Sequence, residues 1–258
     1  MTSIAVHNKG VYETERAVKV YAERFPFVLT PAEAYCVGRI PDDARGSILD
    51  VGIGAGRTTW DLTRLFESYV GIDYSEKFIS AAKLRYSDQD LRVADARSLP
   101  FETQFDCVFF SFNGIDYVEL DDRTRILSEF SRVLLPGGYL IYSTHNLHHS
   151  RVKSWLRSFW VKELFVPIHR LRFIFNRWRN FQRQHCDNAA GIAYVNDPGL
   201  GFSLINAYLD IPREIIRLKG HGLDVEMTMG CTRASATYDS ADCWVYLMAR
   251  KRWPRLSQ

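Results

Sequence analysis

Short apolar runs alternate with amphipathic stretches from residue 47 to about residue 146. The runs are rich in β-branched and aromatic residues, which suits strands covered on both faces, and the stretches between them have helical spacing. The predicted strands are 47–51, 68–72, 91–94, 105–111 and 138–143, and the predicted helices are 57–66, 76–86 and 123–134. This order is typical of consecutive βα units of a parallel sheet with right-handed crossovers.

The segments on either side of this core are mainly helical in pattern. Residues 13–24 and 31–39 are the helices predicted before it. After the last of these strands, residues 152–166 and 168–181 place apolar side chains three or four positions apart, which predicts two amphipathic helices. Beyond them we expect a loop or hairpin at 188–210, a helix at 212–219, and strands near 224–229 and 243–250.

The overall composition suits a globular protein but conceals an uneven distribution of charge. With 258 residues, 47% hydrophobic, the chain is long enough for one large α/β domain or two small ones, and a disordered chain is excluded. The net charge is only +3, yet residues 151–183 carry nine Lys and Arg side chains against one acid, Glu163. This segment has a charge of +8 and the other residues together −5, so a mildly acidic body carries one basic segment.

The sequence also bears on compartment and metal content. The first ten residues lack a secretory-signal pattern, and no apolar run approaches membrane-spanning length. The five cysteines are widely spaced and include no Cys-x-x-Cys pair. We therefore expect free thiols in a reducing cytoplasm, and no metal site.

A glycine-rich turn directly follows the first predicted strand, in Leu49-Asp-Val-Gly-Ile-Gly-Ala-Gly-Arg57. Glycines at such a position let the chain turn sharply and let a ligand approach the main chain. The dinucleotide-binding fingerprint Gly-x-Gly-x-x-Gly is not met, because Arg57 stands where its last glycine is required. A P-loop is excluded because no Gly-Lys-Ser/Thr follows.

Acids end the next two strands. Asp73 follows the second strand, where an α/β sheet of this kind places a carboxylate for ribose hydroxyls, and Asp95 follows the third. Together with the glycine turn and Leu134-Leu-Pro-Gly-Gly138, these motifs make the chain resemble the class I S-adenosylmethionine-dependent methyltransferases. The resemblance covers residues 48–146 closely and extends to 210–250.

That resemblance implies an α/β, Rossmann-like fold with a seven-stranded, mostly parallel sheet whose last strand is antiparallel. Residues 47–146 and 210–250 would form the core that binds S-adenosylmethionine. Residues 1–46 would form an N-terminal helical cap, and residues 147–209 a basic helical insertion that acts as lid and substrate region.

The family pattern also implies roles for individual residues. Asp50 would hold the methionine amino group, Asp73 the ribose hydroxyls and Asp95 the adenine amino group. The remaining cofactor contacts implied are Gly52, Gly54, Gly56, Arg57, Tyr74, Ala96, Ser111 and Asn113. For Asp50 and Asp95 a second interpretation stays open, since short acids at strand ends commonly cap the following turn.

Methyl transfer to a hydroxyl or an ammonium also requires removal of a proton. His145, just beyond the fifth strand, is the first candidate base, because sites in open α/β sheets lie at the carboxyl ends of strands. Asp116, beyond the fourth strand, is the second candidate. A histidine that only caps the strand end is the competing interpretation for His145.

Acceptor contacts are expected from outside the core. Tyr21 in the N-terminal helices, and His149, Tyr194 and Tyr208 in the insertion, are the candidate substrate residues. The basic segment 151–183 could bind an anionic acceptor, rest on an anionic membrane surface, or be a solvated face of the lid. Binding of nucleic acid is disfavoured, since the end of the fourth strand lacks the motifs of base methyltransferases.

These expectations combine into a cytoplasmic enzyme, with a membrane-peripheral location as the variant. It would transfer a methyl group from S-adenosylmethionine to a small molecule or glycan, with oxygen as the favoured atom. Transfer to carbon or nitrogen of an apolar quinone-like or amine acceptor is the alternative within enzymes. A non-catalytic relative that binds the cofactor or an RNA is the alternative outside them. Oligomeric state does not follow from the sequence.

Overall fold

The computed structural model describes residues 3–24, 27–157, 171–231, 237–239 and 241–254. Its strands are β1 (Ser47–Val51), β2 (Ser68–Asp73), β3 (Asp90–Val93), β4 (Phe105–Phe110), β5 (Leu134–Asn146), β6 (His185–Asp187), β7 (Ile192–Val195), β8 (Asn206–Leu209), β9 (Leu223–Gly230) and β10 (Trp244–Lys251). Its α-helices are α1 (Ile4–Tyr12), α2 (Glu15–Arg24), α3 (Pro31–Gly38), α4 (Thr59–Leu65), α5 (Glu76–Lys83), α6 (Leu120–Val133), α7 (Val152–Arg157), α8 (Leu171–Phe181) and α9 (Ile211–Gly220). Three short 3₁₀ helices are η1 (Asp42–Ala44), η2 (Gly114–Tyr117) and η5 (Gly199–Gly201).

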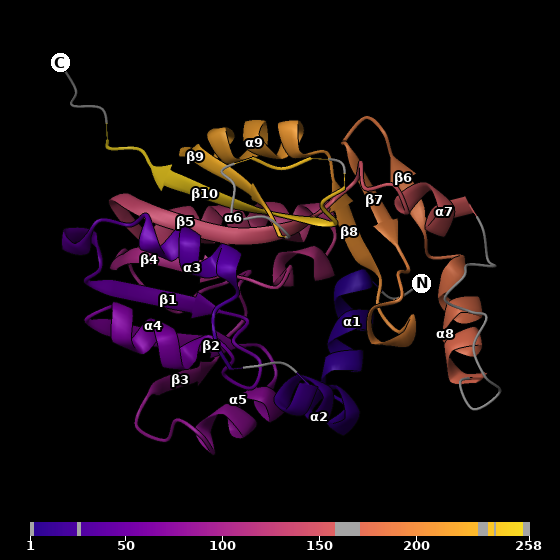
Figure 1. The fold of residues 1–258 in the computed structure, drawn as a ribbon, viewed down its shortest axis with the longest axis horizontal. Helices are drawn as coiled ribbons and strands as arrows, with labels where there is room; N and C mark the ends of the chain where they lie inside the picture. Colours follow the sequence, from indigo (N-terminus) through magenta and orange to yellow (C-terminus); the bar gives the residue numbers. More distant parts are fainter. Residues whose placement is uncertain (1–2, 25–26, 158–170, 232–236, 240, 255–258) are drawn as a thin grey trace.

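One sheet runs through the molecule (Figure 1). Its central part has the strand order β3-β2-β1-β4-β5-β10-β9. The strands from β3 to β5 pair in parallel, whereas β10 runs antiparallel to both of its neighbours. The α/β fold with a mostly parallel sheet and an antiparallel last strand is therefore confirmed.

The seven predicted strands form the central part of a larger sheet, which has ten strands in the described residues. The tip of the long strand β5 extends past the end of β4 and pairs there with β8, through His145 and Tyr208, and β7 and β6 follow. The strands β7 and β8 are four residues long and buried along their whole length, so they lack the alternation that marks a strand in a sequence.

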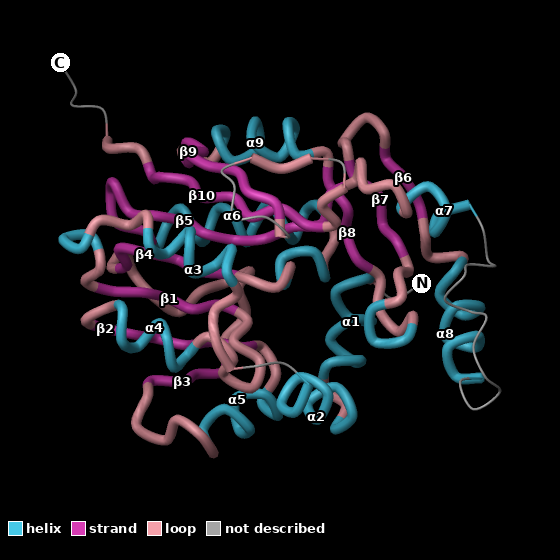
Figure 2. Tube along the Cα trace, in the orientation of Figure 1, coloured by secondary structure: helices cyan, strands magenta, loops and turns pink. Residues whose placement is uncertain are grey.

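The two faces of the sheet are covered by different helices, as the tube in Figure 2 shows. Side chains of α6 and α9 pack on one face with alternate strand residues such as Leu49 and Leu140. Helices α3, α4 and α5 pack on the other face with the intervening residues such as Ile48 and Ile141. Each of these helices buries an apolar stripe against the sheet in this way.

The carboxyl ends of the parallel strands point toward α1, α2 and the insertion (Figure 1). The insertion was predicted as two long helices, but it contains α7, α8 and the strands β6 to β8. The expected hairpin is present as β7 and β8, which pair antiparallel around residues 196–205. The part of the predicted helices between residues 158 and 170 lies outside the described residues. Within the described part of the chain, no helix is long and apolar enough to span a membrane.

Candidate cofactor and acceptor site

A cavity of about 890 Å³, counted with its open mouth, lies where β1, β2 and β4 end. The turn after β1 forms its floor, and Tyr12 and Tyr21 approach it from α1 and α2. The lining residues are Tyr12, Tyr21, 50–55, Arg57, Thr58, Asp73, Tyr74, Phe78, Ala94, Ala96, 110–112, Gly114 and Tyr117. The cavity thus joins residues from the glycine turn, the strand ends and the N-terminal helices.

The glycine turn has the backbone that a ligand cradle requires. Gly52, Gly54 and Gly56 all have positive φ values, of 66°, 55° and 86°. A Cβ atom on Gly52 would lie 2.6 Å from Cε2 of Phe110, closer than side chains tolerate. All three positions therefore favour glycine for conformation, Gly52 favours it for space as well, and the main chain stays open to a bound molecule.

Asp73 ends β2 with its carboxylate in the cavity wall. Its Oδ2 accepts a hydrogen bond from the backbone amide of Gly54 at 2.9 Å, and its Oδ1 accepts one from that of Ser75 at 2.9 Å. Burial raises the pKa of Asp73 to about 6, against the effect of these two amides. Each oxygen has a second lone pair, so the group can accept from two adjacent hydroxyls, as on a ribose.

Asp50 lies deeper, at the end of β1. Its Oδ2 accepts hydrogen bonds from the hydroxyls of Thr58 at 2.6 Å and Tyr69 at 2.9 Å. Burial raises the pKa of Asp50 to about 7, although both hydroxyls and Arg57 favour the ionised form. A ligand ammonium beside this carboxyl would return it to the carboxylate state.

The raised pKa of Asp50 has a measurable consequence for stability. The folded chain holds this proton up to about pH 7, whereas the unfolded chain releases it near pH 4, so stability falls as pH rises between these values. We expect Asp50→Asn to remove this loss. The free energy of unfolding of the variant, relative to the wild type, should rise by about 2–3 kcal/mol between pH 5 and pH 8 in urea titrations.

Asp95→Asn is the matched control for that measurement. Burial disfavours the charged form of Asp95, but hydrogen bonds from Arg97 outweigh it and lower the pKa of Asp95. Asp95 is then ionised in both the folded and the unfolded chain above pH 5, so the free energy difference between Asp95→Asn and the wild type should stay constant between pH 5 and pH 8. Parallel curves for Asp50→Asn and the wild type would contradict the raised pKa of Asp50.

Asp95 lies beside the cavity and is not among its lining residues, whereas its neighbours Ala94 and Ala96 are. Its carboxylate accepts from Nε and Nη2 of Arg97, at 3.0 and 2.6 Å, and from the backbone amide of Arg97 at 2.9 Å. Asp95 thus caps the turn that follows it, which is the second interpretation that the sequence allowed. The predicted contact with an adenine amino group would require part of this ion pair to open.

Arg57 lines the cavity but is already paired. Its guanidinium donates to both oxygens of Glu33, at 2.6 and 2.9 Å, and to Oγ of Ser111 at 2.8 Å. Glu33 comes from α3, where it also caps the helix by accepting from the amide of Thr30. The sequence showed Glu33 only as part of a helix start, so its role as the counterion of Arg57 was not anticipated.

The loop after β4 has an unusual backbone. Phe112 and Asn113 are consecutive non-glycine residues with φ values of 53° and 57°, a conformation that costs about 1–3 kcal/mol for each residue. The backbone amide of Asn113 donates to Oγ of Ser143 at 2.8 Å, and the Phe112 ring stacks on Arg57 with 4.3 Å to the guanidinium carbon. These contacts hold the strained loop against the cavity wall.

His145 and Asp116, predicted as alternative bases, are partners. Nδ1 of His145 lies 2.8 Å from Oδ2 of Asp116, and the backbone amide of His145 donates to the same oxygen at 2.7 Å. Nε2 of His145 lies 3.3 Å from the side-chain nitrogen of Asn113. Neither His145 nor Asp116 lines the cavity, whereas Phe112, Gly114 and Tyr117, which flank Asn113 and Asp116, do.

Asp116 also belongs to a buried ionic network. Arg123 of α6 donates to Asp116 at 2.7 Å and to Glu214 of α9 at 2.7 Å, and all three side chains are fully buried. The pKa of Glu214 is lowered, because Arg123 and Arg217 outweigh its burial. The negative charge of Asp116 is thus shared between Arg123 and His145. No sequence feature indicated this network, since Arg123 occupies an ordinary position in a helix.

The four predicted substrate residues lie in different places. Tyr21 lines the cavity, where its hydroxyl is 3.2 Å from that of Tyr12. Tyr208 stacks on the His145 ring at 4.5 Å between centroids and donates to Asp197 at 2.8 Å. Tyr194 lies away from both, and its hydroxyl accepts from the amide of Leu120. The structure therefore brings one of these tyrosines to the cavity and one to His145.

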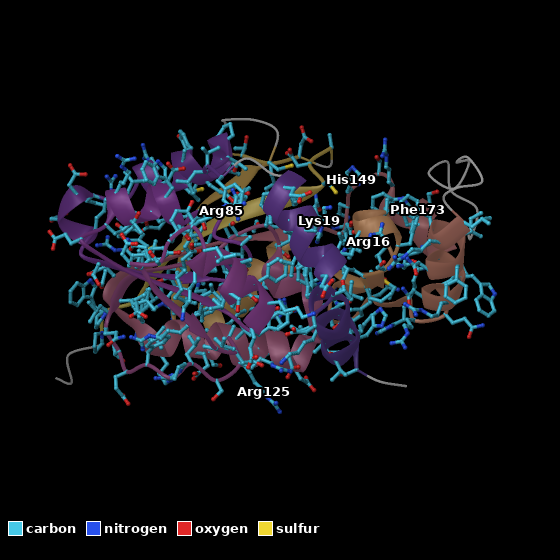
Figure 3. The ribbon with its side chains drawn as sticks, turned by 90° about the horizontal axis from the view of Figure 1, so that it is seen from below. Arg16, Lys19, Arg85, Arg125, His149 and Phe173 are labelled. Carbon is cyan, nitrogen blue, oxygen red and sulfur yellow. The ribbon has the colours of Figure 1, made fainter. Side chains whose placement is uncertain are left out.

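His149 lies at the insertion end of the molecule, which Figure 3 shows with Phe173. Its ring is 6.0 Å from that of Trp155, and its Nδ1 is buried without a hydrogen-bond partner among the described residues. Burial and the nearby Arg151 lower the pKa of His149. It is not one of the lining residues of the cavity.

An aromatic cluster closes the cavity from the N-terminal side. The ring of Tyr12 lies 5.0 Å from Tyr117, 5.7 Å from Tyr21 and 6.1 Å from Phe78. The sequence indicated the N-terminal tyrosines but not Tyr117 or Phe78, because a tyrosine or phenylalanine with helical spacing is more often part of a core. No group of three or more potential metal ligands lies together in the described part of the structure.

Known proteins share this arrangement in sequence and in fold. Residues 49–142 match the family model described as "Methyltransferase domain". A ubiquinone/menaquinone biosynthesis C-methyltransferase of Desulfotalea psychrophila is 33% identical over 109 residues, which are 40% of this chain and 43% of that protein. A fatty-acid O-methyltransferase of Mycolicibacterium smegmatis is 34% identical over 116 residues, 43% of this chain and 41% of that protein. The chain thus matches less than half the length of these curated relatives.

Solved structures extend the likeness in fold to most of the chain. The 1,6-didemethyltoxoflavin-N1-methyltransferase of Burkholderia thailandensis, solved with S-adenosylhomocysteine, has a TM-score of 0.60 at 12% identity. The likeness covers 96% of this chain and 88% of that one. A possible histamine N-methyltransferase of Thermotoga maritima also has a TM-score of 0.60, at 16% identity, and covers 94% and 99%. Residues 49–142 thus carry a methyltransferase domain, and the strand order, the glycine turn and these matches support a class I S-adenosylmethionine-dependent methyltransferase.

Proposed function

We propose that this protein transfers a methyl group from S-adenosylmethionine to a small-molecule acceptor that loses a proton in the reaction. The cavity supports the first part of this proposal, the binding of S-adenosylmethionine. Its open glycine turn, with Asp73 ending β2 beside it, fits a nucleoside with two adjacent ribose hydroxyls. Asp50 fits the amino group of a methionine, since a buried carboxyl with a raised pKa gains most from a neighbouring cation.

The bound cofactor supplies a methyl group already activated by its sulfonium, so the chain has to align the acceptor and exclude water. Tyr74, Ala94 and Ala96 would enclose the adenine, as lining residues beyond Asp73. Tyr12, Tyr21 and Tyr117 would close the cavity over the acceptor. Such an apolar, aromatic wall excludes water while leaving hydroxyl groups that can orient a polar acceptor.

Oxygen is the favoured acceptor atom in this proposal, with His145 as the base. Because Nδ1–H of His145 can donate to Asp116, Nε2 is left as the proton acceptor, and it faces the Asn113 amide. Asp116 would then stabilise the imidazolium that forms, less strongly than an unshared carboxylate because Arg123 also draws on its charge. The acceptor would have to reach Nε2 past Asn113. Transfer to nitrogen would use the same base, and transfer to an activated carbon would not need His145.

The cavity offers little support for an anionic acceptor. Among its described lining residues Arg57 is the one cation, and its charge is balanced by Glu33. In the basic segment, Arg177 is fully buried and donates to the backbone carbonyl oxygens of Asn196 and Trp155. The positive charge predicted for the acceptor entrance is therefore partly structural.

The function is tested by calorimetry and by mass spectrometry. S-adenosylhomocysteine should bind at one site per chain. Incubation with S-adenosylmethionine and panels of hydroxylated, amino and quinone-like acceptors should yield a product heavier by one methyl group. Absence of S-adenosylhomocysteine binding by the folded protein would refute the proposal.

His145→Ala separates the role of the base from that of the cofactor site. We expect single-turnover methyl transfer to a hydroxyl acceptor to slow by about 10²–10⁴-fold, while S-adenosylhomocysteine affinity stays within about twofold, because His145 does not line the cavity. His148→Ala is the matched control, since His148 is exposed and pairs with Asp210 at the surface. A rate near that of the wild type above neutral pH would exclude His145 as the base.

A further inference from the structure

Helix α8 is amphipathic, but its polar side is buried and its apolar side is exposed. The side chains that it buries most completely are polar, namely Asn176, Arg177 and Asn180. Its exposed side chains include Leu171, Phe175 and Trp178, with 59%, 55% and 66% of their surface accessible. The spacing of four and three residues places these three on one stripe of the helix.

The buried polar face of α8 helps to hold the insertion together. Asn176 donates to the carbonyl of Gly201 at 3.0 Å and to Ser203 at 2.9 Å. Asn180 donates to the carbonyl of Phe202 at 2.9 Å. Apolar contact with the body is made by Phe173 and Ile174, at the edge of a small cluster that includes Trp155. The orientation of α8 is therefore fixed by its polar side chains, and the aromatic stripe faces outward as a consequence.

The stripe is surrounded by positive charge. Arg172 and Arg179 are exposed on the same helix, and the Arg179 guanidinium carbon lies 5.9 Å from the centre of the Phe175 ring. The Phe175 and Trp178 rings are neighbours, with centroids 6.2 Å apart. No Asp or Glu occurs in the sequence between Glu163 and Asp187. The surface thus combines exposed aromatic and aliphatic groups with arginines and lacks acids of its own.

We propose that the stripe Leu171, Phe175 and Trp178 docks on an anionic lipid bilayer, with Arg172 and Arg179 at the headgroups. Tryptophan, phenylalanine and leucine on one side of a helix, flanked by arginine, is the composition of helices that lie in the membrane interface. Anionic lipid supplies both the apolar layer and the negative charge that this surface needs. A second copy of the chain fits less well, because a two-fold contact through α8 would bring like-charged arginines together.

If α8 docks on a bilayer, the insertion is the part of the protein that lies against the membrane. Helix α8 lies at the end of the molecule to which the parallel strands point, beyond β6 and β7 (Figure 1). Arg125 of α6 and Arg85, labelled in Figure 3, lie on the body away from α8 and offer exposed arginines for comparison. The membrane contact is independent of the methyl acceptor, so the contact can be tested before the acceptor is identified.

The test is cosedimentation of the full chain with phosphatidylcholine vesicles that contain 30% phosphatidylglycerol. We expect binding at low salt that is weakened by 0.5 M NaCl and is absent from pure phosphatidylcholine. The double substitution Arg172→Gln/Arg179→Gln should lower the partition coefficient about ten- to thirtyfold. Phe175→Ser/Trp178→Ser should lower it to a similar extent, because the inserted groups are lost.

Two control variants change the same residue types elsewhere. Trp60→Ser removes a half-exposed tryptophan of α4, and Arg125→Gln removes an exposed arginine of α6, and both should leave vesicle binding unchanged. All substituted side chains of α8 are exposed, so thermal unfolding of the variants should match the wild type. Absence of binding to the anionic vesicles at low salt, or equal binding by the α8 variants, would overturn the proposal. A concentration-dependent dimer that Phe175→Ser/Trp178→Ser abolishes would assign the stripe to a second copy and likewise overturn it.

Discussion

Asp73→Asn is expected to weaken the binding of S-adenosylhomocysteine at least about 100-fold. Two charge-assisted hydrogen bonds to ribose hydroxyls would be lost, each of about 1.5–3 kcal/mol. The asparagine would also turn an amide N–H toward the backbone amide of Gly54 or Ser75, both of which now donate to the carboxylate. The dissociation constant measured by calorimetry checks this expectation.

A pair of ligands separates ribose recognition from general damage to the fold. With 5′-methylthioadenosine and its 2′-deoxy form, the wild type should distinguish the two by about tenfold or more, and Asp73→Asn should not distinguish them. Asp95→Asn should leave this discrimination intact, since Asp95 lies outside the cavity wall and pairs with Arg97. Equal discrimination by the wild type and Asp73→Asn would show that Asp73 does not bind the ribose.

Arg123→Met is expected to cause the largest loss of stability, about 3–5 kcal/mol in the free energy of unfolding at pH 8. The substitution removes the cation shared by Asp116 and Glu214 and leaves them only His145 and Arg217 as partners, and an incompletely balanced buried charge is costly. The loss should be smaller at pH 5. In the variant both carboxyls would have raised pKa values, and stability is then lost as pH rises through them.

Two further variants define the origin of that loss. Arg125→Gln, two positions along the same helix, should change stability by less than about 0.5 kcal/mol, since Arg125 is exposed and its ion pair with Asp122 is at the surface. Adding Asp116→Asn and Glu214→Gln to Arg123→Met should recover part of the loss. A pH-independent loss that these additions do not reduce would mean that packing, not unpaired charge, is the cause.

The core of the fold could be predicted from the sequence because its information is local. Strands β1 to β4 are short apolar runs with clear ends, and β1 is predicted to the residue. The glycine turn and Asp73 lie at strand ends, and in a parallel sheet all such ends meet at one edge. Position along the chain was therefore enough to bring Asp50, Asp73 and the glycines together.

The insertion was harder to predict, because its pattern of hydrophobic residues does not indicate which side chains are buried. An amphipathic pattern gives the apolar side of α8 but not whether that side faces inward, and here the buried side is the polar one. The strands β7 and β8 are buried throughout, so a periodicity of two never develops. In both cases long-range contacts decide the local outcome.

The sequence by itself determined the chemistry that is available: a glycine turn, acids at strand ends, and a histidine beyond β5. Only the tertiary structure decided which of these groups act on one another. His145 and Asp116 became partners, Asp95 paired with Arg97, and Arg57 was balanced by Glu33. Hydrogen bonds and ion pairs depend on distances of about 3 Å between residues far apart in sequence, and those distances are set by how the helices pack on the sheet.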